Sequence, residues 1–309
     1  MKISISDLEL YVKCPKAYEL HCINKIEPRQ KSLSLCKAIA VRNVLQKVHE
    51  ENKNAGELTD EVIGKRCEEV WKTEISDPKV DQKELEEIVV QAKPATKNKE
   101  ATEAVTKSQK TLNEIKTWCT RYMKLENHSQ VLFNDVRFET EIGDTVFCGK
   151  IDQVRQVQNE IEVLIFNTSS QAPSQNFLAR DFQTSISAYA VWQGKLYPEN
   201  EDCSEEVQVN LIPKVYCFYF PYLEEYKRNG KGQKGDWKGD PKIPVPRTEQ
   251  MLLDFEYEVL TAAAGIELQY FPMRVTNPCG CAICPFAYCC KNDVIEMEQM
   301  EEYIECFQQ

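Results

Sequence analysis

The chain contains 309 residues, of which 42% are hydrophobic, and its 38 lysines and arginines against 49 aspartates and glutamates give a formal net charge of −11. A chain of this length can bury a large core, and none of its apolar runs is long enough to cross a bilayer, which excludes a membrane-spanning protein. The acidic balance also excludes binding to nucleic acid by overall electrostatic attraction, so any such binding must use a local basic patch.

Two features of the sequence bear on its compartment. The segment Met1–Asp7 contains no apolar signal region, which predicts a cytoplasmic protein. The fourteen cysteines are mostly scattered singly in apolar segments, as at Cys36, Cys119, Cys148 and Cys217. In a cytoplasmic chain such cysteines are expected to be reduced core residues rather than disulfide partners.

Two helices are predicted within residues 1–55, which are expected to begin the core. The first has Ser6 as its N-cap, bends at Pro15 and presents Cys14. The second has apolar residues at helical spacing and carries His49, which is interpreted as a surface residue rather than a metal ligand.

Residues 56–130 are rich in glutamate, lysine and threonine, and their apolar residues, such as Trp118 and Tyr122, recur at helical spacing. We therefore predict a helical insertion, with a linker-like break at Lys93–Lys99. A scaffolding role is favoured for this insertion. A cover over a single-stranded substrate and a docking surface for a protein partner are the alternatives.

Residues 131–222 are predicted to form a core with a mixed sheet, and after Asn134 the hydrophobic period changes to two. Strands are predicted over 136–142 and 146–154, joined by a turn at Gly143, and over a buried segment 161–167. A helix over 181–193 and a strand over 213–220 then complete an αβββαβ order. We expect a mixed α/β (α+β) core built around these elements.

A segment rich in glycine and lysine covers residues 223–247. Its basic and aromatic residues suit phosphate neutralisation and base stacking, although a flexible solvated loop has the same composition. The candidate nucleic-acid contacts are Lys227, Arg228, Lys231, Lys234, Trp237 and Lys238. Residues 248–292 are expected to hold a helix and then a cysteine cluster. Residues 293–309 form an acidic amphipathic tail that, like the insertion, offers a surface to a protein partner.

The cysteine cluster has a C-x2-C-x5-C spacing, made by Cys281, Cys284 and Cys290. Together with Cys14 near the other end of the chain, it supplies four thiolates, which is the ligand set of a zinc or an iron–sulfur site. Cys279 and Cys289 leave the exact set open, because a purely local zinc site can be built when Cys279 takes the place of Cys14.

Two runs of sequence carry a family resemblance. They are Ile3–Tyr11, which leads into Cys14, and Ala262–Ile266 with Tyr270–Pro272, which precede the C-terminal cysteines. They resemble the RecB-like nucleases of the PD-(D/E)XK superfamily that carry an iron–sulfur cluster, such as CRISPR-associated exonucleases of spacer acquisition and their phage relatives. The resemblance implies a 4Fe–4S cluster, with zinc as the alternative, that joins the two ends of the fold. Its ligands would be Cys14, Cys281, Cys284 and Cys290.

The resemblance also implies a nuclease site, in which magnesium or manganese ions are held by acidic residues and a lysine acts on the attacking water. Asp152 in the Gly149–Asp152 motif matches the first acid, and Tyr189 matches the tyrosine of a Gln-x-x-x-Tyr helix motif. The other matched positions have changed: Arg42 replaces a histidine, Ile165 an acid, Asn167 the lysine and Ser185 the glutamine.

These replacements remove the chemistry of the site. Isoleucine has no oxygen donor for a hard cation, and an asparagine amide cannot carry the charge of a lysine. We therefore expect a catalytically degenerate nuclease fold that binds DNA, single-stranded or at ends, or acts as a subunit or decoy in a DNA-processing or phage–host complex. The alternatives are an active magnesium- or manganese-dependent DNA exonuclease of recombination, repair or spacer acquisition, and a protein–protein interaction module.

Overall fold

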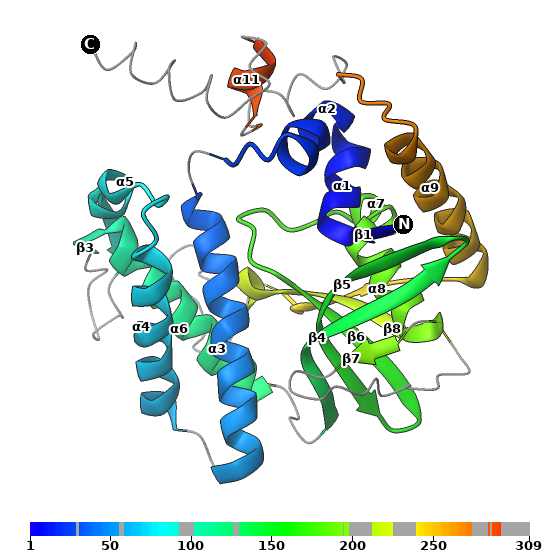
Figure 1. Ribbon diagram of the computed structural model, residues 1–309. Helices are drawn as coiled ribbons and strands as arrows, with labels where there is room; N and C mark the ends of the chain where they lie inside the picture. The colour runs from blue at the N-terminus through cyan, green and yellow to red at the C-terminus, as the bar shows by residue number, and fades with distance from the viewer. Residues whose placement is uncertain are drawn as a thin grey trace.

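The computed structural model describes residues 1–28, 31–55, 59–92, 102–125, 130–193, 195–197, 212–224, 239–273, 284 and 286–291. Figure 1 shows a central sheet with one group of helices on each side. Several predictions fall outside the described residues. They concern the linker Lys93–Lys99, the basic contacts between Lys227 and Lys238, the thiols of Cys279 and Cys281, and the tail 293–309.

The described residues form a seven-stranded mixed sheet in the order β7-β4-β5-β6-β8-β9, with β1 paired to β5 off this path. The long strands β4, β5 and β6 form an antiparallel meander, whereas β8 is parallel to β6 and β1 is parallel to β5. The strands are β1 (Lys2–Ser4), β4 (Val131–Ile142), β5 (Thr145–Val157), β6 (Glu160–Asn167), β7 (Lys195–Tyr197), β8 (Lys214–Tyr219) and β9 (Lys242–Val245).

The predicted αβββαβ order is confirmed by α3, β4, β5, β6, α8 and β8. The turn between β4 and β5 contains Gly143, whose φ of 58° is a left-handed conformation that glycine adopts without steric cost. The parallel step from β6 to β8 passes through α7 (Gln175–Ala179) and α8 (Phe182–Gln193), as a parallel crossover requires. The short strands β1, β7 and β9 and helix α7 were not predicted.

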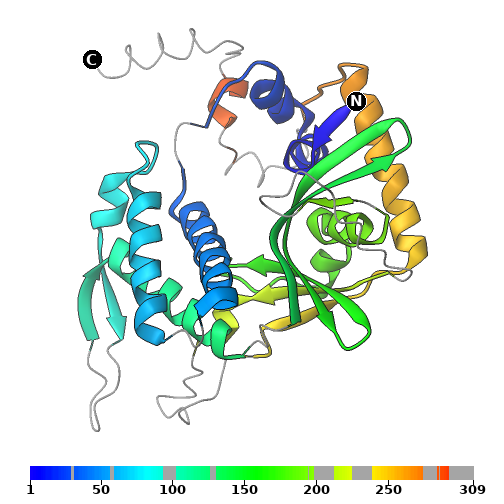
Figure 2. The same cartoon turned by 60° about the horizontal axis from the view of Figure 1, so that its bottom comes forward.

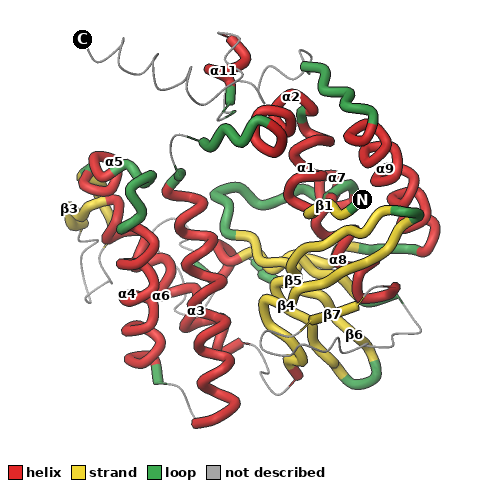
Figure 3. The backbone as a smooth tube through the Cα atoms, viewed as in Figure 1, coloured by secondary structure: helices red, strands yellow, loops and turns green. Residues whose placement is uncertain are grey.

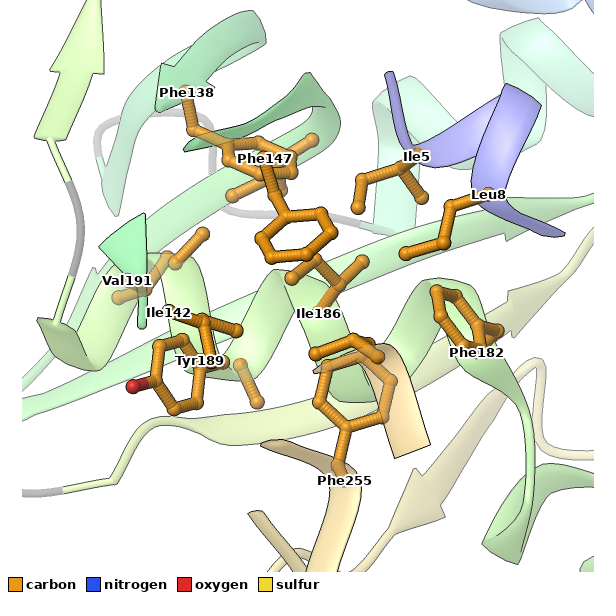
Figure 4. Close-up of a cluster of buried hydrophobic side chains, with 14 of the residues drawn as sticks. Ile5, Leu8, Phe138, Ile142, Phe147, Phe182, Ile186, Tyr189, Val191 and Phe255 are labelled. Atoms are coloured by element: carbon orange, nitrogen blue, oxygen red, sulfur yellow. The ribbon is translucent and has the colours of Figure 1, made fainter. Parts of the chain in front are cut away.

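One face of the sheet is covered by α1 (Ile5–Lys13), α8 and α9 (Glu249–Glu267). Figure 2 shows α8 enclosed between the sheet and α9. Their apolar side chains form one cluster with the sheet, drawn in Figure 4, in which the rings of Phe182 and Phe255 meet edge to face at 4.8 Å. This cluster anchors the strands that carry the candidate site.

The other face is covered by α3 (Leu33–Ala55), α4 (Asp60–Ile75) and α6 (Lys107–Leu125). Tyr122 of α6 lies at the centre of an aromatic group that includes Phe166, Phe218 and Phe220 from the sheet side. Because these residues belong to one buried cluster, the insertion shares its core with the sheet.

The insertion is not entirely helical, which corrects the prediction. After α5 (Gln82–Glu86), β2 (Ile88–Ala92) and β3 (Thr102–Thr106) pair as an antiparallel two-stranded sheet, visible in Figure 3. Their β-branched residues favour strands, and five residues are too few to reveal a period against the surrounding helical pattern.

The N-terminal segment differs in detail from the prediction. Helix α1 starts at Ile5, so its cap is Ser4 rather than Ser6, and the hydroxyl of Ser4 accepts a hydrogen bond of 3.1 Å from the amide of Asp7. The helix ends before Cys14, and the chain continues through α2 (Pro15–Tyr18), a π-helical turn (Glu19–Ile23) and, much later, α11 (Ala287–Lys291). A short 3-10 turn, Phe220–Leu223, follows β8. Among the described helices, none combines the length and the hydropathy that a bilayer-spanning helix needs.

Candidate functional site

A cleft with a volume of about 830 Å³ opens beside β1, β4 and β5. Its walls also include the first turns of α1, Arg42 of α3, Gln183 of α8 and Tyr197 of β7. Four basic and four acidic side chains line it: Lys2, Arg42, Arg137, Lys150, Glu9, Asp135, Glu139 and Asp152. The cleft therefore carries balanced charges, and what it can bind depends on which of these charges are already paired.

The retained acid, Asp152, is bound by an arginine. Nε of Arg42 lies 2.5 Å from Oδ1 of Asp152, and Nη2 donates a longer hydrogen bond of 3.5 Å to Oδ2. The backbone amide of Phe166 in β6 donates to the same Oδ2 at 2.7 Å. Only 8% of the Asp152 side chain is exposed, so both of its oxygens are engaged within the protein.

The charge on Asp152 is the main cause that raises the pKa of the Arg42 guanidinium, with a further contribution from Asp135, whereas burial opposes the shift. Arg42 therefore remains a cation at any pH at which the fold is stable. A guanidinium fixed against a carboxylate in this way neutralises it without a metal ion.

A second carboxylate, Asp135, lines the cleft next to Asp152 and was not predicted. It forms an ion pair with Lys150, and it adopts φ of 47°, a conformation that aspartate tolerates better than most residues. Its neighbours in β4, Asn134 and Val136, pair with Gln153 and Ile151 on either side of Asp152. We call Asp152, Arg42, Asp135 and Lys150 the paired centre, because each of its charges has an opposite partner.

The two degenerate positions on β6, Ile165 and Asn167, do not contribute polar groups to the cleft. Ile165 is 7% exposed and belongs to the hydrophobic cluster on the α8 side of the sheet. Asn167 ends the strand, and its side-chain oxygen accepts hydrogen bonds from the amide of Ser169 at 2.9 Å and from its hydroxyl at 2.7 Å. Such contacts to the backbone two residues further on are typical of asparagine in turns. The side-chain amide of Asn167 therefore stabilises the turn after β6.

Helix α8 presents a different residue to the cleft from the one that the motif indicates. Tyr189 lies in the hydrophobic cluster, as Figure 4 shows, and its hydroxyl donates to Oε1 of Glu256 at 2.6 Å. Burial is the main cause that raises its pKa. Ser185 is buried and donates to the carbonyl of Asp181. Gln183 instead lines the cleft and donates to the carbonyl of Lys150 at 3.1 Å.

The segments that carry the family resemblance are in contact. The hydroxyl of Tyr11 donates to the carbonyl of Tyr270 at 2.9 Å, and the rings of Tyr18 and Phe271 stack at 5.8 Å. A Cβ atom at Gly265 would lie 2.1 Å from the Tyr11 hydroxyl oxygen, which explains the need for glycine in this helix. The two runs of sequence therefore form one structural unit.

Beside this unit, cysteines from both ends of the chain come together. Cys14, Cys284 and Cys290 pack against one small cluster that contains Cys289 and Phe286. Burial, followed by the neighbouring Cys284 and Cys14, raises the pKa of the Cys290 thiol to about 11. We call Cys14, Cys284 and Cys290 the cysteine clasp. Among the described residues, no group of three or more potential ligands is arranged to hold a metal ion. Cys281, the fourth predicted ligand, lies outside them.

A sequence model of the PD-(D/E)XK nuclease superfamily matches residues 2–291. The chain belongs to this superfamily. None of the curated proteins compared with it is similar enough to count as a relative. Membership of the PD-(D/E)XK superfamily agrees with the αβββαβ core and with the position of Asp152 on the second strand of the meander.

His49 lies behind the paired centre of this PD-(D/E)XK fold, and its interpretation as a surface residue was wrong. It is 4% exposed, and its Nε2 lies 3.4 Å from the amide nitrogen of Gln153. Gln153 is completely buried, accepts from the Tyr122 hydroxyl at 2.8 Å and donates to Oδ1 of Asn134 at 2.6 Å. This network joins α3, α6, β4 and β5 one residue away from Asp152.

Several cleft residues were missed, and the sequence contained a signal for some of them. Arg137 alternates in β4 with the buried Val136 and Phe138, so its exposure follows from the period of two. Asp135 follows the same alternation, but it lies just before the predicted strand 136–142, whereas β4 starts at Val131. Tyr197 lies on a three-residue strand that carries no detectable period.

Proposed function

We propose that this PD-(D/E)XK protein is a catalytically degenerate nuclease that binds nucleic acid in its cleft without a catalytic metal ion. The observation that carries the proposal is the 2.5 Å contact between Arg42 Nε and Asp152 Oδ1. A divalent ion at Asp152 must first displace this guanidinium, which already neutralises the carboxylate.

The loss of ligands on β6 supports the same conclusion. A two-ligand or three-ligand site for magnesium needs oxygen donors from neighbouring strands. Ile165 offers none, and the side-chain oxygen of Asn167 is occupied by Ser169. Neither side chain therefore provides the oxygen ligand for a cation or the lysine charge that phosphodiester hydrolysis requires in this superfamily.

Nucleic acid is favoured as the ligand because the cleft, with four basic and four acidic side chains, is balanced in charge within a chain of net charge −11. One of its basic side chains, Arg137, has no carboxylate partner among the described residues. The basic residues between Lys227 and Lys238 belong to the same proposal as further contacts to phosphates. The protein would act in this way as a DNA-binding subunit or decoy in a DNA-processing or phage–host complex, with the acidic insertion and tail facing a protein partner.

The cysteine clasp is part of the proposal as the ligand set of a 4Fe–4S cluster completed by Cys281, with zinc as the alternative. Its role would be to hold the N-terminal unit against the C-terminal segment. Brown absorption of the purified protein, lost in Cys14→Ser, would support the cluster. A colourless protein that contains zinc in stoichiometric amount would contradict it.

The decisive experiment measures binding and cleavage separately. Fluorescence polarisation with a labelled oligonucleotide in EDTA at low salt should detect binding. Incubation of the same oligonucleotide with magnesium or manganese should leave it intact. Metal-dependent cleavage that disappears in Asp152→Ala would overturn the proposal, and absence of all binding would favour a protein–protein interaction module.

The second candidate is an active metal-dependent exonuclease with a rearranged site, and one observation favours it. Asp135 and Asp152 line the same cleft together with Lys150, so two carboxylates and a lysine are available if Arg42 moves away. This candidate requires that cleavage depends on Asp135 as well as Asp152. Cleavage by the wild-type protein that survives in Asp135→Asn would contradict it.

A further inference from the structure

Three residues form a row across the outer strands of the sheet. Arg137 of β4 pairs with Lys150 of β5 on one side and with Tyr197 of β7 on the other. All three line the cleft. Residues opposite each other on neighbouring strands lie on the same face with Cβ atoms about 4.5–5.5 Å apart. The three side chains therefore project together into the cleft wall.

Two like charges stand directly opposite each other in this row, which is unfavourable for a sheet. Lys150 is compensated by Asp135. Arg137 is exposed, and no carboxylate of the described residues lies within ion-pair distance of it. An exposed guanidinium without an internal partner leaves on the cleft wall a positive charge that is available to an anion from outside the chain.

The carboxylate in the next row is already used. Glu139 pairs with Cys148 and Lys195 across the strands, and its side chain forms an ion pair with Lys2. Arg137 therefore remains the point in the cleft with unneutralised positive charge and a partly exposed aromatic ring, Tyr197, beside it. A guanidinium next to such a ring matches a phosphate joined to a planar base.

We propose that Arg137 and Tyr197 form a subsite for one nucleotide of a single-stranded nucleic acid. The guanidinium of Arg137 binds the phosphate, and the ring of Tyr197 stacks on the base. In a duplex the bases are stacked inside the helix and cannot reach the ring, so the subsite selects single strands. This inference rests on the proposed function, and it places the contact outside the Asp152–Arg42 pair.

The test uses the full-length protein in EDTA and a fluorescent oligonucleotide in three forms: single-stranded, duplex, and single-stranded with abasic residues. Arg137→Ala should weaken binding of the single strand about tenfold and reduce the slope of log affinity against log salt by about 0.7. Tyr197→Ala should weaken binding of the single strand about tenfold, and should leave binding of the abasic strand unchanged. Tyr197→Phe should retain binding because the ring remains.

Lys65→Ala is the matched control, because Lys65 is an exposed lysine on α4 and does not line the cleft. Its substitution should leave affinity unchanged. Wild-type binding that is unaffected by Arg137→Ala and Tyr197→Ala would overturn the subsite while the proposed function stands. Equal affinity for duplex and single strand would also overturn it. Absence of wild-type binding to every form would overturn both.

Discussion

Two parts of the same cleft differ in whether their basic side chains are paired with carboxylates. In the paired centre, Arg42 and Lys150 are each held by a carboxylate, and the Asp152 side chain is nearly buried. A few residues along β4, Arg137 has no such partner among the described residues and stands beside Tyr197. In the paired centre each charge has a partner within the protein, whereas the charge of Arg137 is available to the nucleic acid that we propose as the ligand.

The contrast predicts that the two arginines differ most in their effect on stability. Arg42→Met should lower the free energy of unfolding by about 3 kcal/mol, because it leaves a buried carboxylate unpaired. Arg137→Met, the matched control, should change it by less than about 0.5 kcal/mol. Urea unfolding followed by circular dichroism measures both. Similar losses of unfolding free energy in the two variants would contradict the stabilising role given to the ion pair between Arg42 and Asp152.

The network behind the paired centre should show the next largest effect. Gln153→Leu removes the hydrogen bonds of the buried Gln153 to the Tyr122 hydroxyl and to the Asn134 amide oxygen, which should cost about 2 kcal/mol. Gln156→Leu, on the exposed part of the same strand, should be nearly neutral. The measurement is again urea unfolding, and equal stability of the two variants would contradict the role given to Gln153.

Metal binding sharpens the comparison further. In Arg42→Ala, Asp152 loses its guanidinium partner and becomes available to a cation, while Asp135 keeps its ion pair with Lys150 beside it. Manganese at ten times its dissociation constant should then raise the free energy of unfolding by about 1.4 kcal/mol. The wild-type protein should gain nothing. Thermal unfolding with and without manganese tests this, and equal stabilisation of both proteins would mean that Arg42 does not occupy the place of an ion.

The smallest expected change in the free energy of unfolding concerns Asp181, a partly buried carboxylate outside the paired centre. Burial raises its pKa, although hydrogen bonds from Thr184 partly oppose the shift. Its contribution to stability is therefore full below the unfolded pKa of about 3.9 and is lost as the pH rises through the higher folded pKa. Asp181→Asn should gain stability relative to wild type, by less than about 1 kcal/mol, between pH 4 and pH 7. A relative loss over this range would reverse the sign of the shift.

The sequence predicted the sheet meander and the crossover well, because the change of hydrophobic period after Asn134 and the turn at Gly143 are local signals. The degenerate site stays a prediction, which depends on the residue types at 165 and 167 because ligand chemistry depends on the side chain. Burial of His49 was not predictable from its own helix. It depends on Tyr122 and Gln153, which reach it from distant segments.

The remaining misses have similar causes. The importance of Asp135 depends on strand register and on a backbone angle that no sequence pattern reveals. Gln183 rather than Ser185 faces the cleft because the start of α8 fixes the rotation of the helix, and element boundaries are the least accurate part of a sequence prediction. Arg137 and Tyr197 meet only because a three-residue strand pairs with β4.

The pairing of β1 with β5 has a consequence for biosynthesis. Lys2 and Ser4 line the cleft, and their strand β1 is held there by pairing with Val146–Cys148 of β5. At a translation rate of about 5–20 residues per second, the partner strand leaves the ribosome on the order of ten seconds after β1. During translation, β1 therefore remains unpaired and accessible to chaperones until β5 is available to pair with it.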